Sequence, residues 1–199
     1  MLTVICETPG TLKAEQRDRP VRAEGQVLVR VKRVGVCGTD LHIFTGNQPF
    51  LDYPRVMGHE LSGVVEDAAP GGRLAVGDVV YVMPYLSCGH CVACRQGKTN
   101  YCVNIQVLGV HRDGAFTEYL ALPEAFVHKA EGVTLDQAAM VEFLAIGAHA
   151  VANLHVGRLR VVELARAAVV ELHGDAIVVD GAAVHILLQR AANQGPANH

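Results

Sequence analysis

Four of the six cysteines in this 199-residue chain lie within a fifteen-residue stretch, with the spacing C-x2-C-x2-C-x7-C. They are Cys88, Cys91, Cys94 and Cys102. Adjacent C-x2-C pairs place thiolates on one side of a tight loop, where four sulfurs can close a tetrahedral site. The spacing predicts a structural zinc site. Iron in a tetrahedral sulfur site is the alternative, because geometry alone does not separate the two metals.

Disulfide bonds are the other common use of clustered cysteines, and they are typical of small secreted chains. This chain is long enough to bury its own core, and its first ten residues lack the basic region and apolar stretch of a secretory signal. Metal binding is therefore favoured. His90 is predicted to be a solvated loop residue, since four thiolates already fill a closed site. Cys6, in an apolar run, is predicted to be a small buried hydrophobic residue.

A second set of metal-ligating residue types is spread over separate segments of the chain. Cys37 lies in a glycine-containing segment, His59 and Glu60 begin 22 residues later, and Glu142 lies far downstream. A thiolate, an imidazole and a carboxylate suit an open zinc site that keeps a position for water or substrate. Each residue taken singly also has an ordinary structural explanation, so the residue types alone leave both interpretations open.

The composition excludes several classes of protein. Half of the residues are hydrophobic, 19% are charged, and the formal net charge is −3, which is typical of a globular chain. No basic block suggests nucleic-acid binding, and no apolar run reaches the roughly 18 residues of a membrane span. The sequence predicts a cytoplasmic protein with no nucleic-acid or membrane partner.

The elements that must position these residues are predicted to be mainly strands. Alternating or apolar runs indicate strands at 27–34, 61–66, 79–82 and 116–122, and glycine-containing turns between them are typical of a barrel or sandwich. Apolar residues at roughly helical spacing predict a helix over 135–150, with Thr134 as its N-cap.

Six motifs then occur in a fixed order: G-x-C-G-T-D-x-H, G-H-E-x-x-G-x-V, G-D-x-V, the four-cysteine loop, G-x-F-x-E-Y and E-x-L-x-x-x-x-H-A. This set resembles the zinc-dependent medium-chain alcohol dehydrogenases, and most closely their polyol, sugar-acid and threonine dehydrogenase branch. The resemblance covers about residues 1–152. It implies a mainly β fold with some α: a GroES-like, partly open β-barrel catalytic domain at 1–152, followed by a short α/β tail at 153–199.

The resemblance also implies roles for individual residues. Cys37 and His59 match the family's catalytic zinc ligands, Glu60 matches an adjacent glutamate that approaches or ligates the metal, and Glu142 matches a glutamate near or on it. Thr39 and His42 match a relay that carries the alcohol proton outward.

Two further positions bear on this site. Asp40 is expected to orient His59 or its loop, with an Asx-type turn as the ordinary alternative. The family usually has proline after the downstream glutamate, whereas this chain has Phe143, which puts the aim of Glu142 in doubt.

The implied activity is oxidation of a secondary alcohol of a polyol or sugar acid to a ketone. The implied cofactors are two zinc ions per chain and NAD or NADP, the substrate is a small-molecule alcohol, and a homo-oligomer is possible for the family. Two alternatives stay open. One is a catalytic-domain fragment that binds two zinc ions without dehydrogenase activity, and the other is a non-enzymatic zinc-binding module.

Residues 153–199 motivate those alternatives. No two of the 20 glycines are separated by a single residue, so the G-x-G-x-x-G dinucleotide fingerprint is absent from this sequence. The segment most similar to such a motif, 174–184, is predicted to form a strand and turn like the first of a Rossmann unit, and a helix is predicted to start at 187–193. Segments 160–164 and 168–172 could serve as substitute barrel strands. The sequence therefore predicts an atypical or truncated tail that lacks a complete Rossmann domain.

Overall fold

The computed structural model describes residues 1–153 and 178–179. The described strands are β1 (Leu2–Thr8), β2 (Thr11–Gln16), β3 (Gln26–Gly35), β4 (Glu60–Asp67), β5 (Val79–Val82), β6 (Tyr85–Leu86), β7 (Gln106–Val107), β8 (Tyr119–Pro123), β9 (Val127–Lys129) and β10 (Val178–Val179). The helices are α1 (Gly38–Thr45), α2 (Val92–Arg95), α3 (Leu135–Ala139) and α4 (Val141–Asn153), with short 3-10 turns η1 (Thr99–Tyr101) and η2 (Glu124–Phe126). The fold is mainly β with some α, as predicted.

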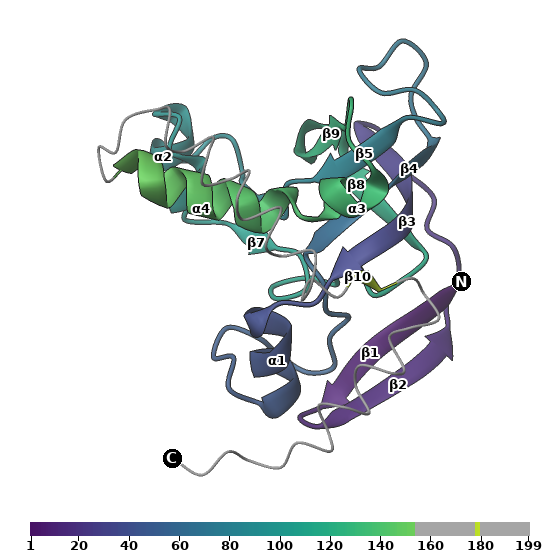
Figure 1. Cartoon of the computed structure of the whole chain (residues 1–199), viewed down its shortest axis with the longest axis vertical. Helices are drawn as coiled ribbons and strands as arrows, with labels where there is room; N and C mark the ends of the chain where they lie inside the picture. The colour runs from purple at the N-terminus through teal and green to yellow at the C-terminus, as the bar shows by residue number, and fades with distance from the viewer. Residues whose placement is uncertain (154–177, 180–199) are drawn as a thin grey trace.

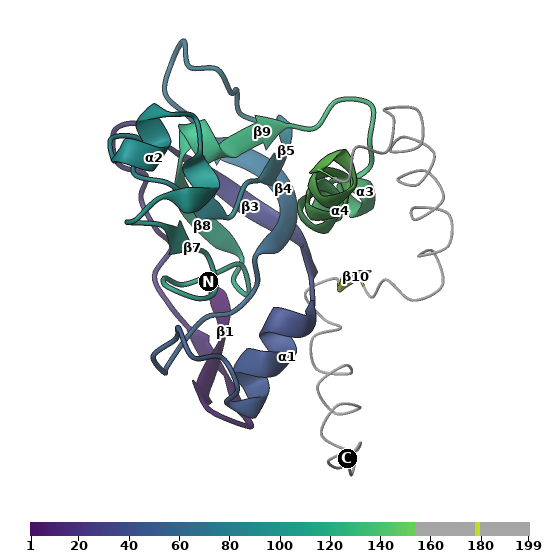
Figure 2. The ribbon, with the colours of Figure 1, turned by 90° about the vertical axis from the view of Figure 1, so that its left-hand side faces the viewer.

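A curled six-stranded sheet forms the centre of the molecule (Figures 1 and 2). Its strands run in the order β10-β3-β4-β5-β9, and β8 also pairs with β3. All of these pairs are antiparallel. The sheet is a partly open half-barrel, and β1 and β2 form a separate hairpin at one end of it.

The long strand β3 confirms the strand predicted at 27–34, with one local difference. Val27 and Val29 are buried and Arg30 is exposed, as the alternation predicts, but Leu28 is buried too. The register between β3 and β4 shifts between Leu28 and Val29, and a bulge of this kind re-aims side chains. Three consecutive residues of this strand, 27–29, are therefore all buried in the core.

The other predicted strands are confirmed, two of them with changed bounds. The strand predicted at 61–66 spans 60–67, and the one at 79–82 is confirmed. The strand predicted at 116–122 begins only at Tyr119, because Phe116 instead bonds through its backbone to Val4 of β1. The predicted helix over 135–150 is two helices with Met140 between them, and Thr134 caps the first through a capping box with Gln137.

The structure also contains elements that the sequence did not predict, including β6, β7, β9 and α2. The β1–β2 hairpin and α1 are absent from the sequence predictions, although Cys6 in β1 is fully buried as predicted. The two-residue strand β10 pairs with Val34 and Gly35 of β3, inside the segment read as a possible Rossmann strand. The substitute strands considered at 160–164 and 168–172, and the helix at 187–193, lie outside the described residues.

Candidate metal centres

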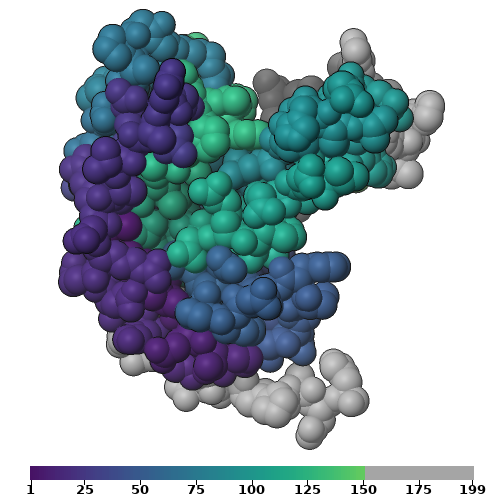
Figure 3. Space-filling model, turned by 180° about the vertical axis from the view of Figure 1, so that it is seen from behind, coloured from purple at the N-terminus to yellow at the C-terminus, as the bar shows by residue number. Residues whose placement is uncertain are grey.

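The four clustered cysteines come together in a lobe, residues 85–107, that we term the cysteine lobe. Its framework is the β6–β7 pair with α2 and η1 between the two strands. All four Sγ atoms lie within 4.8 Å of one another. Figure 3 shows the cysteine lobe, in teal, protruding from the rest of the described chain.

The spacing of the sulfurs fits a tetrahedral metal. Zinc–sulfur bonds of about 2.3 Å place two sulfurs about 3.8 Å apart in a tetrahedral site, and the Cys88 and Cys94 Sγ atoms are 4.0 Å apart. Backbone N–H groups point at the sulfurs: the Cys88 amide donates to Cys102 Sγ at 3.3 Å, and the Cys94 amide donates to Cys91 Sγ at 3.5 Å. The donor set is therefore built for a thiophilic ion.

Thiol pKa values in this lobe follow the same contacts. The His90 backbone amide lowers the pKa of Cys88 to about 6, and the Cys94 amide lowers that of Cys91. Burial raises the pKa of Cys94 to about 11. Without metal the cluster thus holds both thiolate and thiol, and a metal ion must displace the remaining protons.

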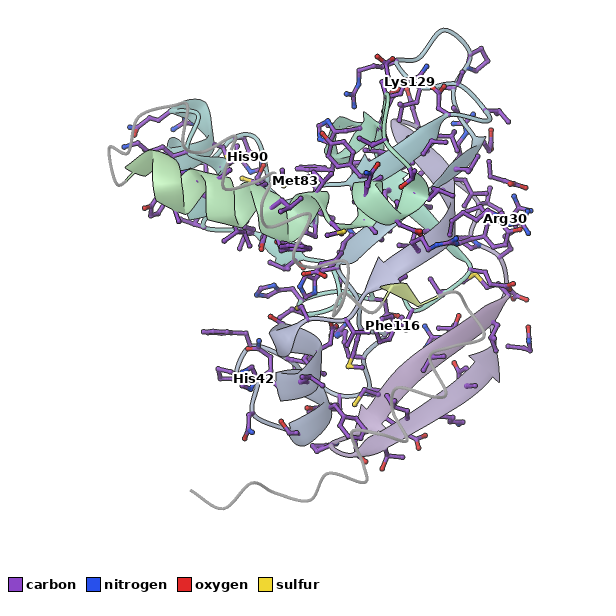
Figure 4. The ribbon with its side chains drawn as sticks, viewed as in Figure 1. Arg30, His42, Met83, His90, Phe116 and Lys129 are labelled. Carbon is purple, nitrogen blue, oxygen red and sulfur yellow. The ribbon has the colours of Figure 1, made fainter. Side chains whose placement is uncertain are left out.

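His90 lies outside the ligand set, as predicted. It is exposed, and its Nδ1 donates to the Cys88 carbonyl at 2.7 Å (Figure 4). The ring therefore supports the loop that carries the first cysteine, rather than adding a fifth ligand.

The second candidate centre begins at Cys37, the N-cap of α1. Its Sγ accepts from the Thr39 amide at 3.3 Å, and the Asp40 carboxylate accepts from the Cys37 amide at 3.0 Å, which completes a capping box. The other Asp40 oxygen accepts from the Gly58 amide at 3.0 Å. One buried carboxylate thus ties together the loops that carry Cys37 and His59, so the expected loop-orienting role of Asp40 matches its contacts.

His59 faces Cys37 across this centre. Its Nε2 lies 3.1 Å from Cys37 Sγ. In a tetrahedral site with ordinary zinc bonds these atoms are about 3.6 Å apart, so a small outward movement accommodates a metal between them. The buried Nδ1 of His59 has no hydrogen-bond partner among the described residues. Such an orphaned ring atom is unusual for a satisfied structural histidine.

Two glutamates complete the cluster. One ligand atom each of His59, Glu60 and Glu142 lie within 4.8 Å of one another, and all three residues are buried. Within residues 1–153, no ion pair to lysine or arginine reaches either carboxylate. Two buried carboxylates without a cationic side chain are costly. A bound cation fits these residues because it would compensate both charges.

Burial changes the pKa values of the side chains at this site. It raises the pKa of Glu60 to about 7, with Glu142 and Asp40 adding to the increase against the opposing effect of His59. Burial, reinforced by the negative charge of Asp40, raises the pKa of Cys37 to about 11. In the metal-free chain the thiol holds its proton at neutral pH, and zinc binding must release it.

Glu60 reaches the site because its cross-strand partner is a glycine. Gly35 pairs with Glu60 between β3 and β4, and a Cβ on Gly35 would lie 2.3 Å from Glu60 Oε2 and 3.0 Å from Glu60 Cβ. Gly35 and Glu60 each belong to a sequence motif, but neither motif marks the contact between them.

Gly35→Ala is expected to keep the fold and to weaken zinc binding at the second centre by about tenfold, the lower end of the effect of disturbing outer-shell groups. The added methyl must push the Glu60 carboxylate aside. Competition of the protein with a chromogenic chelator measures this affinity. Gly38→Ala is the matched control, since a Cβ there meets nothing within 4 Å. Equal affinity in both variants would contradict the placement of Glu60.

The structure places both predicted relay residues on α1. Thr39 is half-buried beside Cys37, and His42 is exposed in the last turn of the helix (Figure 4). The three-residue separation puts them on the same face of the helix. Helix α1 was not predicted because its N-cap is a cysteine followed by glycine, and neither residue is typical of a helix start. Only the C-x-x-D spacing of the capping box indicates this helix in the sequence.

Sequence analysis also missed Tyr85, whose hydroxyl donates to Glu142 Oε1 at 2.5 Å. Its position three residues before Cys88 ties it to the cysteine lobe, and no chemical motif includes it. Glu142 lies in the first turn of α4, so Phe143 in place of the family's proline has not removed the carboxylate from the centre.

The chain is similar to known proteins over most of its described residues. The model of the alcohol dehydrogenase GroES-like domain matches residues 23–132. L-galactonate-5-dehydrogenase of Escherichia coli K12 is 45% identical over 152 residues, which cover 76% of this chain and 45% of that protein. L-threonine 3-dehydrogenase of Pyrococcus abyssi is 41% identical over 116 residues, which cover 56% of this chain and 33% of that protein.

Solved structures show the same relationship. A short chain alcohol dehydrogenase from E. coli CFT073, complexed with NADH, has a TM-score of 0.71 at 41% identity and covers 77% of this chain and 45% of its own. Galactitol-1-phosphate dehydrogenase from E. coli has a TM-score of 0.70 at 30% identity, covering 75% and 44%. The chain spans less than half the length of these relatives. It belongs to the alcohol dehydrogenase GroES-like domain family.

Proposed function

We propose that residues 1–152 form the zinc-binding catalytic domain of a nicotinamide-dependent dehydrogenase that oxidises a secondary alcohol of a polyol or sugar acid to a ketone. The convergence of half-buried Cys37 with buried His59, and of His59 with buried Glu60 and Glu142, carries this proposal. Relatives named as L-galactonate-5-dehydrogenase and galactitol-1-phosphate dehydrogenase support the substrate class.

The residues at the second centre fall into metal ligands and proton-relay residues. Cys37 and His59 would hold zinc, with Glu60 or Glu142 as the third protein ligand, and zinc when bound supplies Lewis-acid polarisation of the substrate hydroxyl. Thr39, whose backbone amide donates to Cys37 Sγ, would relay the proton of the substrate hydroxyl. Exposed His42, further along α1, would pass that proton to solvent.

The hydride acceptor is NAD or NADP. Structures of relatives with NADH, and with NADP in a zinc-binding dehydrogenase from Sinorhizobium meliloti, support this choice. The four cysteines of the lobe hold a second, structural zinc, in line with their closed tetrahedral spacing. The proposed substrate is a small-molecule alcohol, the proposed oligomeric state is a homo-oligomer, and the proposed location is the cytoplasm. None of the helices in residues 1–153 has the length and hydropathy of a membrane span.

The zinc-loaded chain is titrated with NAD and with NADP by calorimetry. It is expected to bind one of the two cofactors at micromolar concentration. A panel of polyols and sugar acids should then show cofactor-dependent turnover that Cys37→Ala abolishes, since that change removes the thiolate ligand but leaves the cysteine lobe intact. Absence of binding at millimolar cofactor would overturn the proposal. It would favour a two-zinc domain without dehydrogenase activity. One metal per chain would indicate a non-enzymatic zinc module.

A further inference from the structure

We propose that Tyr85 is a positioning residue that holds Glu142 in the second metal centre. This inference rests on the proposed function, because it assigns a role toward the metal site formed by Cys37, His59, Glu60 and Glu142. The residue lies outside that ligand set and in a different part of the chain from α4.

The contact between Tyr85 and Glu142 has the geometry of a strong hydrogen bond. The phenolic oxygen lies 2.5 Å from Glu142 Oε1, within the range of O–H···O⁻ bonds. A phenol ordinarily stays protonated at neutral pH and is a donor. Glu142 is buried, so water does not compete freely for the same oxygen.

A hydroxyl is suited to hold a carboxylate without cancelling its charge. Lysine or arginine at this place would pair with Glu142 and reduce its attraction for a metal cation. Tyr85 fixes the direction of the side chain and leaves the negative charge in the cluster with His59 and Glu60. Hydrogen bonds of this kind from outside the ligand set commonly tune metal affinity.

The place of Tyr85 in the fold makes its ring a fixed support. It begins β6, where it pairs with Val107 of β7 at the base of the cysteine lobe. Glu142 sits in the first turn of α4. Tyr85 therefore holds Glu142 from a strand paired at the base of the cysteine lobe, and not from α4 itself.

Tyr85→Phe tests this role because it removes one oxygen and keeps the ring. The expected result is about tenfold weaker zinc binding at the second centre, with the cysteine-lobe site unchanged. The absorption bands of the cobalt-substituted second centre are expected to shift, since the carboxylate near the metal is reoriented. Thermal unfolding measured on the same samples checks that the fold is kept.

Tyr81→Phe is the matched control. Tyr81 lies in β5 with its ring stacked on His128 at 5.3 Å, so loss of its hydroxyl is expected to leave both metal sites unchanged. In a Glu142→Gln background, Tyr85→Phe is expected to cause no further loss, because the group it positions is already altered.

Two results would overturn the inference in distinguishable ways. If the unmodified chain binds two metal ions and Tyr85→Phe keeps zinc affinity within twofold and the same cobalt spectrum, only the role of Tyr85 is wrong. If the unmodified chain has a single metal site, in the cysteine lobe, the proposed function is wrong and the role of Tyr85 falls with it.

Discussion

Gly114→Ala is expected to lower the free energy of unfolding by about 3 kcal/mol, at the upper end of ordinary overpacking, and to weaken metal binding at His59. A Cβ on Gly114 would lie 2.2 Å from the Gly58 carbonyl oxygen and 2.6 Å from that of Met57. Both contacts are to backbone, which cannot rotate away as a flexible side chain can.

The loop that carries His59 is held by the segment around Gly114. The Gly114 amide donates to Val56 O at 2.7 Å, and the Phe116 amide donates to Met57 O at 3.0 Å. Gly58, with φ +91°, crosses closely against this segment. Forcing the two backbones apart is therefore expected to shift His59, which directly follows Gly58.

Urea unfolding and the cobalt spectrum of the second centre measure the two effects. Gly147→Ala in α4 is the control, because a Cβ there meets nothing within 4 Å and alanine is favoured over glycine in a helix by up to about 1 kcal/mol. Wild-type stability in Gly114→Ala would show that the close backbone crossing is wrong.

Cys94→Ser is expected to unfold the cysteine lobe while the central sheet stays folded. The lobe contains few buried apolar residues and exposes Tyr101 and Val103, so its order depends on the metal. We expect the free energy of opening the lobe to fall by about 3 kcal/mol or more. Because the open form is then about 100 times more populated, trypsin is expected to cleave the lobe about 100-fold faster. Limited trypsin digestion at Arg95 and Lys98 measures this rate.

Cys37→Ser provides the comparison, since it removes a thiolate from the other centre and leaves all four lobe cysteines in place. Its lobe is expected to resist trypsin as the unmodified chain does. A Cys94→Ser chain with wild-type resistance would mean that the lobe is ordered by its own packing, and the structural zinc would lose its physical basis.

The sheet could be predicted, and the candidate ligand residues singled out, because each carries a local signal. Valine alternation marks β3, and the cysteine spacing marks the lobe. The ordered motifs indicated the family, which the domain match at 23–132 confirms. These features depend on residues close together in the chain, or on a pattern of residue types in a fixed order.

The remaining parts depend on contacts between distant residues. Tyr85 meets Glu142 across 57 positions of sequence, and Gly35 is required only because Glu60 lies opposite it in the register. The break at Met140 interrupts an apolar spacing that continues through both helices. No local propensity encodes such relationships, so only the folded arrangement reveals them.

Zinc content per chain tests the central claim of two separate metal centres most directly. Metal analysis of purified, zinc-loaded protein is expected to give two zinc ions in the unmodified chain and one in each of Cys37→Ser and Cys94→Ser. A single zinc in the unmodified chain, unaffected by Cys37→Ser and lost in Cys94→Ser, would contradict the account, because the buried cluster around His59 would then hold no metal.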